Sequence, residues 1–495
     1  MQRNAIILIS ICLCLLPFTA VQAQRDTIRL TLEETVKLAQ LQSVDAAVAL
    51  NSLKTAYWQY RTHKADQLPE VNFTGTVPSY SNNYSRYQQA DGSYTFVQNN
   101  WMTLNGKMSI DQNIALTGGR ISLVSSLDFT RQLGKGAHNE YMSIPLGLSL
   151  VQPVFGVNNQ KWQRRIEPVR YREAQAMYIE NTEEVTLSAI TYFFNLLHAR
   201  ENLMIALQNS ENADKLYQVA LAKRQIGYIS ESDVMQLELS ALQAKGLVTE
   251  AMSNLNANMF QLRSFLALDE DAVIEPVEPP TAPELRVTYN DVLDKALENN
   301  SFAQQIRRRQ LEADYAVATA RGNLRNINLF ATIGYTGKDV GLRDSYDRLQ
   351  ANQMVEVGVT IPLLDWGKRK GQVKVAESNR DVVLSRIHQD QMTFNQDIFL
   401  LTENFNNQAA QIEIAARADL VAGKRYNTSI EIFLTGNISV LDLNDARKSK
   451  DEARLKHIDE LYKYWRYYYN IRSITLFDFL TGNNLDAEFE EIVRR

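Results

Sequence analysis

The sequence predicts an internally duplicated α+β protein in which long helices alternate with groups of two-faced strands. The first observation is a repeat: RLTLEETVKLAQLQS at 29–43 returns as RVTYNDVLDKALENN at 286–300, an offset of 257 residues. The second is that six segments alternate apolar and polar residues with the period of a β-strand. The third is a heptad spacing of apolar residues that continues far beyond an average helix. We therefore expect coiled-coil helices and a sheet with one apolar and one polar face.

The composition is that of a folded protein and argues against nucleic-acid binding. The chain has 495 residues, of which 22% are charged and 45% are hydrophobic. Its formal net charge is -5, and no basic run is long enough for a nucleic-acid footprint. We expect no nucleic-acid partner.

The first 23 residues predict an export signal. Arg3 supplies a positive start, residues 5–16 form a short apolar run, and Val21-Gln22-Ala23 is a small-residue cleavage pattern. We therefore expect a signal peptide at 1–23 and a mature chain that begins at Gln24. No later segment approaches the roughly 20 apolar residues of a membrane-spanning helix. Any membrane insertion is therefore expected to use strands.

Both cysteines of the chain, Cys12 and Cys14, lie inside the predicted signal peptide. The mature chain is therefore expected to have no disulfide, no thiolate metal ligand and no cysteine nucleophile. Neither cysteine follows the predicted cleavage site, so a lipid anchor is not expected.

The duplication divides the rest of the chain into two repeats, a linker and a tail. The first repeat is expected at 24–274, with a helix, strands within 70–155 and long helices within 167–268. The second is expected at 288–480, with a helix, strands within 327–363 and long helices within 367–476. A proline-rich linker at 275–287 and a C-terminal tail at 481–495 complete the chain. Four prolines in the linker predict a stiff extended strap, and a flexible domain linker is the alternative.

The long helices of each repeat are broken by a related motif. Gly227, Ser230 and Asp233 return as Gly436, Ser439 and Asp442, an offset of 209 residues. After the first break, apolar residues at alternating spacings of three and four predict a seam with one polar member: Val234, Leu237, Ala241, Ala244, Val248, Ala251, Leu255, Asn258, Leu262 and Phe265. The helix before it carries a stripe of Ala189, Phe193, Leu196, Leu203 and Leu207. The aromatic run YKYWRYYYN at 462–470 is interpreted as a further helix seam, with a bilayer-interface belt as the alternative.

Six segments predict strands with one apolar and one polar face, four in the first repeat and two in the second. They begin at Val71, Leu104, Ile121, Ile144, Leu329 and Val355. At about ten residues each they have the length of a tilted membrane-crossing strand. We expect long polar loops at 79–94, 132–140 and 337–350 and a tight turn at 116–120, the asymmetry of outer-membrane barrels. A half-buried sheet of a soluble protein is the alternative.

Six strands do not close a membrane barrel alone, because lipid does not tolerate an unpaired strand edge. If the strands enter a membrane, copies from neighbouring chains must complete the barrel. The sequence leaves open whether the hairpin at about 101–131 enlarges such a barrel from 12 to 18 strands.

Over the whole mature chain the pattern resembles the TolC-type outer-membrane efflux protein family. The resemblance is carried by LTLEETVKLA with Leu68-Pro69 after it, by VQPVFGVNNQKWQRRIEP at 151–168, by IPLLDWGKRKGQVKVAE at 361–377 and by the paired glycine motifs. It implies a homotrimer whose strands pool into one β-barrel, continuous with a coiled-coil tunnel in the periplasm. It also implies a passive exit duct for a tripartite efflux pump or type I secretion system. Its partners are then outer-membrane lipid, a periplasmic adaptor and an inner-membrane transporter.

The same resemblance implies where the functional residues lie. Gly227, Ser230, Gly436 and Ser439 are implied at helix tips that contact the adaptor. Asp442 and Asp445 are implied to line the tunnel entrance, with Asp233 as a further acidic candidate. Three chains then present rings of carboxylates, which attract cations. The alternative is that these aspartates only cap and solvate helix starts.

The closing contact of the entrance is expected to depart from the family pattern. Members that lock it with a tyrosine and an arginine have those residues just before the acidic pair, where this chain has Phe433 and Ile438. Phe433, Leu434 or Arg425 are candidates for a different closure.

No catalytic, metal or cofactor site is expected. The five histidines lack metal-ligand spacing, and no catalytic triad, nucleophile elbow or phosphate-binding glycine loop is visible. The chief rival function is a periplasmic coiled-coil scaffold or adhesin that never inserts, and a secreted hydrolase is a distant third.

Overall fold

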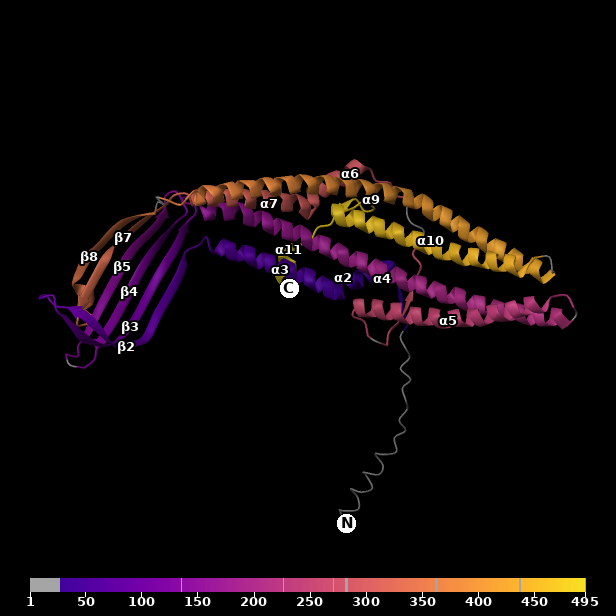
Figure 1. The fold of residues 1–495 in the computed structure, drawn as a ribbon, viewed down its shortest axis with the longest axis horizontal. Helices are drawn as coiled ribbons and strands as arrows, with labels where there is room; N and C mark the ends of the chain where they lie inside the picture. Colours follow the sequence, from indigo (N-terminus) through magenta and orange to yellow (C-terminus); the bar gives the residue numbers. More distant parts are fainter. Residues whose placement is uncertain are drawn as a thin grey trace, which may run out of the picture. The chain divides into compact units, whose positions relative to one another are not determined.

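Helices and strands follow one another in the order that the duplication predicts (Figure 1). The computed structural model describes residues 27–134, 136–225, 227–269, 271–280, 284–360, 364–435 and 438–494. The predicted signal peptide lies outside these residues. The chain forms two compact units, each described by itself: residues up to 47 with 184–285 and 404–470, and residues 48–183 with 286–403 and 471–495. Each unit thus takes segments from both sequence repeats.

The helices of the two repeats match in length and spacing. The opening helices of the first repeat are α2 (Leu32–Gln42) and α3 (Val44–Ala65), and those of the second are α6 (Tyr289–Asn299) and α7 (Ser301–Gly322). Both pairs contain 11 and then 22 residues. The long helices also correspond: α4 (Asn159–Gln225) and α5 (Glu231–Phe265) contain 67 and 35 residues, α9 (Lys368–Thr435) and α10 (Val440–Thr475) 68 and 36. These equal or nearly equal lengths support the duplication inferred from the sequence.

The opening helices begin at matching threonine caps. The Thr31 hydroxyl accepts a hydrogen bond from the Glu34 amide, and the Thr288 hydroxyl accepts one from the Asp291 amide, each at 3.2 Å. Such bonds satisfy an amide that has no partner inside the helix. The repeated sequence therefore encodes the same helix start twice.

The strands of the second unit form one antiparallel sheet in the order β2-β3-β4-β5-β7-β8 (Figure 1). The strands span Glu70–Gln88, Tyr94–Ile114, Gly119–Gln132, Asn139–Pro153, Asn326–Asp339 and Leu349–Thr360. All six segments predicted as strands lie in this sheet. The hairpin at 101–131 supplies β3 and β4 and lies between β2 and β5, not elsewhere in the fold.

Two sequence expectations about the strands are wrong. The strands contain 12 to 21 residues, longer than the ten expected. The segment 79–94 is not a long loop, because β2 and β3 pair up to Gln88 and Tyr94 and leave only a short turn. Its asparagines and serines outweighed in this prediction the tyrosines at 80, 84 and 87, a residue type that favours strands. The connection at 337–350 contains the four-residue helix α8 (Asp344–Asp347).

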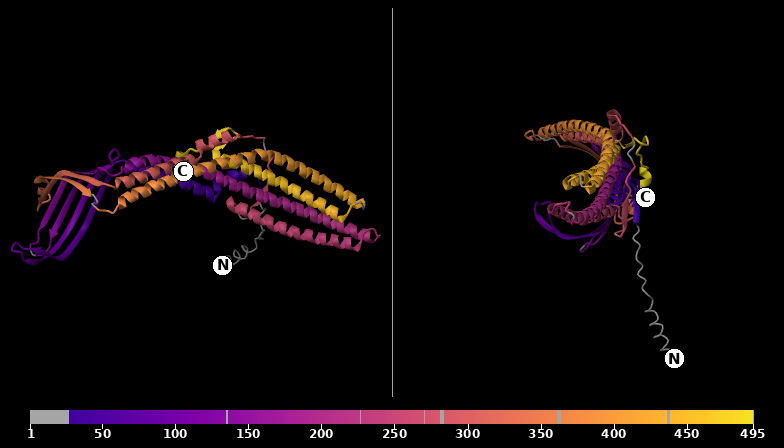
Figure 2. Two further views of the ribbon diagram at one scale, coloured as in Figure 1. Left: turned by 45° about the horizontal axis from the view of Figure 1, so that its top comes forward. Right: turned by 90° about the vertical axis from the view of Figure 1, so that its right-hand side faces the viewer.

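In the first unit the long helices lie side by side in the order α9, α10, α4 and α5 (Figures 1 and 2). Polar contacts join neighbours: Asn209 of α4 donates to Asp451 of α10 at 2.7 Å, and Lys245 of α5 pairs with Asp214 of α4 at 3.0 Å. The predicted seam of α5 is buried at six positions, among them Val234, Leu237 and Leu262. Leu207 departs from its predicted stripe, since half of it is exposed.

The aromatic run at 462–470 forms the predicted helix seam. Tyr464 is fully buried, and its ring contacts Phe405 with centroids 5.3 Å apart. Burial raises the pKa of the Tyr464 hydroxyl to about 12. The seam interpretation is therefore confirmed over the interface belt.

The linker region is tied to the helices of the first unit. Strand β6 (Val273–Pro276) pairs in parallel with β1 (Thr27–Leu30). Arg200 of α4 donates to Glu275 at 2.8 Å, and Arg454 of α10 donates to Glu278 at 2.8 Å. These contacts favour the strap over a flexible linker, although residues 281–283 lie outside the described residues.

The C-terminal segment contains ordered elements within the second unit. Strands β9 (Phe477–Asp478) and β10 (Asn483–Asn484) pair, and helix α11 (Phe489–Arg494) follows. The Phe489 ring lies 6.4 Å from that of Tyr178. Among the described residues, no helix has the length and apolarity needed to span a membrane.

Candidate functional site

The two breaks between long helices form the tips of helical hairpins, and the first is built by a glycine. Gly227 has φ +74°, a left-handed conformation that a side chain disfavours. Its amide donates to the Arg224 carbonyl at 3.0 Å, and the Tyr228 amide donates to the Lys223 carbonyl at 2.9 Å. These two bonds form a Schellman motif, which satisfies the last carbonyls of α4. The matching Gly436 lies outside the described residues.

A serine and an aspartate start the second helix of each hairpin. At the first tip the Ser230 hydroxyl donates to the Asp233 carboxylate at 2.6 Å and accepts from the Asp233 amide at 3.2 Å. At the second tip Ser439 and Asp442 repeat both bonds, at 2.6 and 3.1 Å. The two tips therefore share a helix cap, and this geometry gives Asp233 and Asp442 a structural role.

Asp445 differs from the other two acidic candidates because it forms an ion pair. The Arg425 guanidinium of α9 donates to the Asp445 carboxylate at 2.7 Å, and both side chains remain more than half exposed. Asp445 lies one helical turn after Asp442 on α10, as expected. Arg425 was expected from the sequence as a closure candidate, but its pairing with Asp445 was not predicted.

A buried cluster holds the two tips together. It contains Ala220 of α4, Val234 and Leu237 of α5, Tyr426 and Phe433 of α9, and Val440, Leu443 and Ala446 of α10. Phe433 is only 5% exposed, so its ring belongs to this core. The expectation that Phe433 closes the entrance in place of a tyrosine therefore finds no support in its position. The side chain of Leu434 lies outside what the structure describes.

Lys223 is a tip residue that the sequence did not single out. Its ammonium group donates to the Phe433 carbonyl at 3.2 Å and lies 5.4 Å from the centre of the Phe433 ring. A cation near the last carbonyls of a helix is stabilising. The only sequence signal is position, since Lys223 and Phe433 each lie two residues before the end of a long helix.

The hydroxyl group of Tyr426 bonds a polar side chain of α4. Its hydroxyl oxygen accepts a hydrogen bond from the Asn212 amide group at 3.3 Å. Burial raises the pKa of this hydroxyl, so Tyr426 stays neutral at physiological pH.

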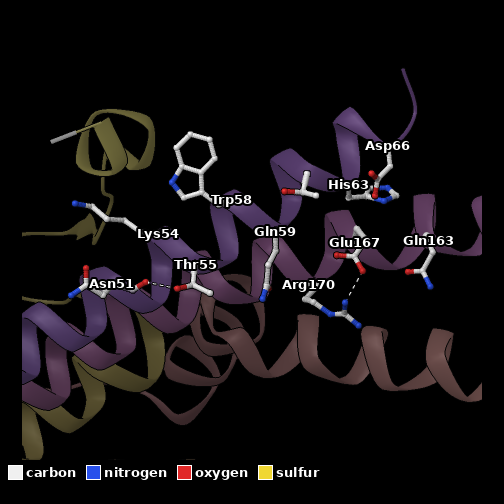
Figure 3. Close-up of a pocket in the computed structure, with 11 residues that line it drawn as sticks. Asn51, Lys54, Thr55, Trp58, Gln59, His63, Asp66, Gln163, Glu167 and Arg170 are labelled. Atoms are coloured by element: carbon white, nitrogen blue, oxygen red, sulfur yellow. Dashed lines mark hydrogen bonds and ion pairs between the residues drawn. The ribbon is translucent and has the colours of Figure 1, made fainter. Parts of the chain in front are cut away.

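An open groove of about 860 Å³ lies along α3 and α4 in the second unit (Figure 3). Its lining includes the acidic residues Asp66 and Glu167, the basic residues Lys54 and Arg170, and Trp58, His63 and uncharged polar residues. Glu167 accepts from Arg170 at 2.6 Å, and the His63 ring bonds Gln67 at 2.9 Å. These bonds pair Glu167 and His63 with neighbouring side chains. The described residues do not contain a group of three or more His, Cys, Asp or Glu suited to a metal ion.

Comparison with known proteins finds a family model that resembles part of the chain. Residues 292–475 match the family model of the outer membrane efflux protein. The matched residues run from α6 to the end of α10, and therefore cover most of the second repeat. A comparison with curated proteins finds no match.

Solved structures of outer-membrane efflux channels share the fold. The CmeC outer membrane channel of Campylobacter jejuni is 16% identical with a TM-score of 0.66, and covers 94% of this chain and 88% of its own. The outer membrane protein VceC of Vibrio cholerae is 15% identical with a TM-score of 0.63, and covers 92% of this chain and 97% of its own. The efflux-protein resemblance stated from the sequence is thus confirmed, and so is the α+β fold class.

Proposed function

We propose that this efflux-protein chain is one third of a homotrimeric outer-membrane channel, the passive exit duct of a tripartite pump or type I secretion system. Three copies pool their strands into a membrane barrel, and their long helices form a tunnel in the periplasm. The single observation that carries this proposal is the six-stranded sheet with two faces and two open edges. The channel moves solutes without chemistry, and an inner-membrane transporter supplies the energy through a periplasmic adaptor.

The faces of the sheet support a barrel wall between lipid and water. One row across five strands is entirely apolar: Val71, Ile110, Leu123, Leu148 and Ile333. The adjacent row on the opposite face is polar at its first five positions: Glu70, Asp111, Ser122, Ser149 and Thr332. Outer-membrane barrels alternate in this way between lipid and lumen.

The edge helices of the first unit support association of copies. On α5, the apolar residues Met235, Leu239 and Leu242 follow heptad spacing away from the buried seam and are each more than half exposed. On α9, Ile414 and Val421 are seven residues apart and are also more than half exposed. Exposed stripes at both edges of a helical layer suit packing against the same edges of further copies.

The helix tips are the proposed entrance and adaptor contact. Asp442 and Asp445 line the entrance, and Asp233, the equivalent of Asp442 in the first repeat, is a further acidic residue there. The tips that meet the adaptor are built by Gly227, Ser230, Gly436 and Ser439. In this proposal Ser230 and Ser439 also cap their helices, and the carboxylates of Asp233 and Asp442 accept from the cap hydroxyls. The double variant Asp442→Ala with Asp445→Ala is expected to reduce cation preference and block by multivalent cations. Unchanged selectivity would contradict the acidic ring but would not contradict the channel.

Planar-bilayer recording on protein purified from outer membranes tests the function. The exit-duct proposal predicts discrete single-channel conductance. A periplasmic scaffold or adhesin predicts none and leaves the membrane on carbonate washing, and a hydrolase predicts turnover without conductance.

A further inference from the structure

The hairpin of β3 and β4 is an integral part of the wall that the sheet forms. β3 pairs with β2 on one side and with β4 on the other, and β4 pairs with β5 over 11 residue pairs. The sequence left open a contribution of four or six strands by each chain. The strand order gives six strands for the single chain, because β3 and β4 lie between β2 and β5 in the sheet.

The two edge strands run in opposite directions. Every neighbouring pair in the order β2-β3-β4-β5-β7-β8 is antiparallel, and an even number of strands therefore leaves edges of opposite direction. The β8 edge of one copy can thus pair with the β2 edge of the next and keep the alternation that bacterial outer-membrane barrels have.

The outward faces of both edge strands are apolar and uncovered. On β2, Val71 and Phe73 are 59% and 77% exposed, and on β8, Val355 and Val357 are 71% and 58% exposed. Their backbone edges have no strand partner within the described sheet. In hydrocarbon such an edge is costly, so a second copy of this chain is the occupant that satisfies both features.

On the basis of the proposed trimer, we infer that the channel closes as an 18-stranded barrel, with six strands from each chain. Barrel diameter grows roughly linearly with strand number, and barrels of 16–18 strands enclose an aqueous channel. The lumen is lined by the polar row that contains Asp111, Ser122 and Thr332. The exit is therefore wide enough for larger hydrated solutes than a 12-stranded barrel, with four strands from each chain, would admit.

Cysteine pairs in the cysteine-free mature chain test the edge contact. The side chains of Thr74 and Glu356 point to the same face of the sheet, because the pairing of the strands places both residues in rows of the polar face. A panel combines Thr74→Cys with Asn352→Cys, Met354→Cys or Glu356→Cys, because a disulfide needs Cβ atoms about 4 Å apart and the register between copies is unknown. At least one pair is expected to give covalent trimers in outer membranes.

A matched control places the second cysteine on the other face. Thr74→Cys with Val355→Cys is expected to give no cross-link, because Val355 points to the opposite side of β8. Covalent dimers as the end product, equal cross-linking of the control, or no cross-link in the panel would overturn the inference.

Polymer exclusion tests the width of the lumen. Polyethylene glycols of graded size are added only to the side that the barrel faces, and the largest polymer that lowers conductance is recorded for the wild-type channel. A variant lacking Tyr94–Gln132 keeps β2, β5, β7 and β8, and its lumen area is expected to fall to roughly half if diameter follows strand number. The same polymer limit in both channels would contradict a wall that includes the hairpin.

The outcomes separate this inference from the proposed function. Absence of conductance in the wild-type protein contradicts the exit duct itself. A conducting wild-type channel with negative cross-links retains the exit duct and rejects the 18-stranded wall. If the deletion variant does not reach the membrane, the polymer limit of the wild-type channel still measures the lumen width, and the cross-linking panel still tests the edge contact.

Discussion

The two helix tips start their second helices in the same way, but they differ one turn after the cap. Ser230 and Asp233 form the same cap as Ser439 and Asp442, with the same bonds at nearly the same lengths. One turn later the first tip has Gln236, whereas the second has Asp445 paired with Arg425. In both copies the shared aspartate is explained by its bonds to the cap serine. The added aspartate has no such explanation, so it is the stronger candidate for selecting cations.

The largest expected effect comes from the core that both tips share. Replacing Phe433 by alanine removes a buried ring from the cluster of four helices and is expected to destabilise the tips by about 3 kcal/mol or more. Hydrogen exchange of the α9 and α10 amides near the break measures this loss. The exposed neighbour Glu431→Ala serves as a control and is expected to change exchange little. Similar exchange in both variants would show that the tips do not depend on this core.

The second effect tests whether the caps are equivalent. Ser230→Ala and Ser439→Ala each remove the acceptor of one helix-start amide and are expected to cost about 1 kcal/mol each. Faster exchange of the Asp233 and Asp442 amides reports the two losses separately. A large loss at one tip with none at the other would contradict the claim that the tips share one structural cap.

The duplication and the six strands could be predicted from the sequence, because both depend on spacing along the chain. Offsets of 257 and 209 residues and alternation of apolar residues are readable without coordinates. The Arg425–Asp445 pair was not predictable, because its members lie on different helices and a surface pair leaves no periodic signal. The burial of Phe433 was not predictable for a related reason. Its burial depends on Lys223 and on three other helices that the sequence does not bring together.

The third effect separates Asp445 from the caps. Asp445→Asn is expected to lower the cation-to-anion permeability ratio by up to about fivefold, the factor that corresponds to about 1 kcal/mol for an exposed charge. Arg425→Gln removes the counter-charge and is expected to raise the ratio. Stability should change little in either variant, since exposed ion pairs contribute at most about 1 kcal/mol. Equal shifts of the same sign in the two variants would contradict the assignment.

The smallest expected effect comes from making the first tip resemble the second. Gln236→Asp adds an exposed acid at the position that Asp445 occupies in the second repeat. This change is expected to increase cation preference slightly, by less than Asp445→Asn lowers it. Reversal-potential measurements in a salt gradient give both numbers. A Gln236→Glu channel provides a longer acid at the same site, and a loss of cation preference in either variant would argue that the first tip does not face the permeation path.

The central claim is that one polypeptide supplies only part of a membrane channel. The mass of the detergent-extracted outer-membrane protein, measured by light scattering with correction for bound detergent, tests this claim most directly. The account predicts a particle of three chains that resists carbonate extraction from the membrane. A single chain as the stable membrane species, or release of the protein by carbonate, would contradict it.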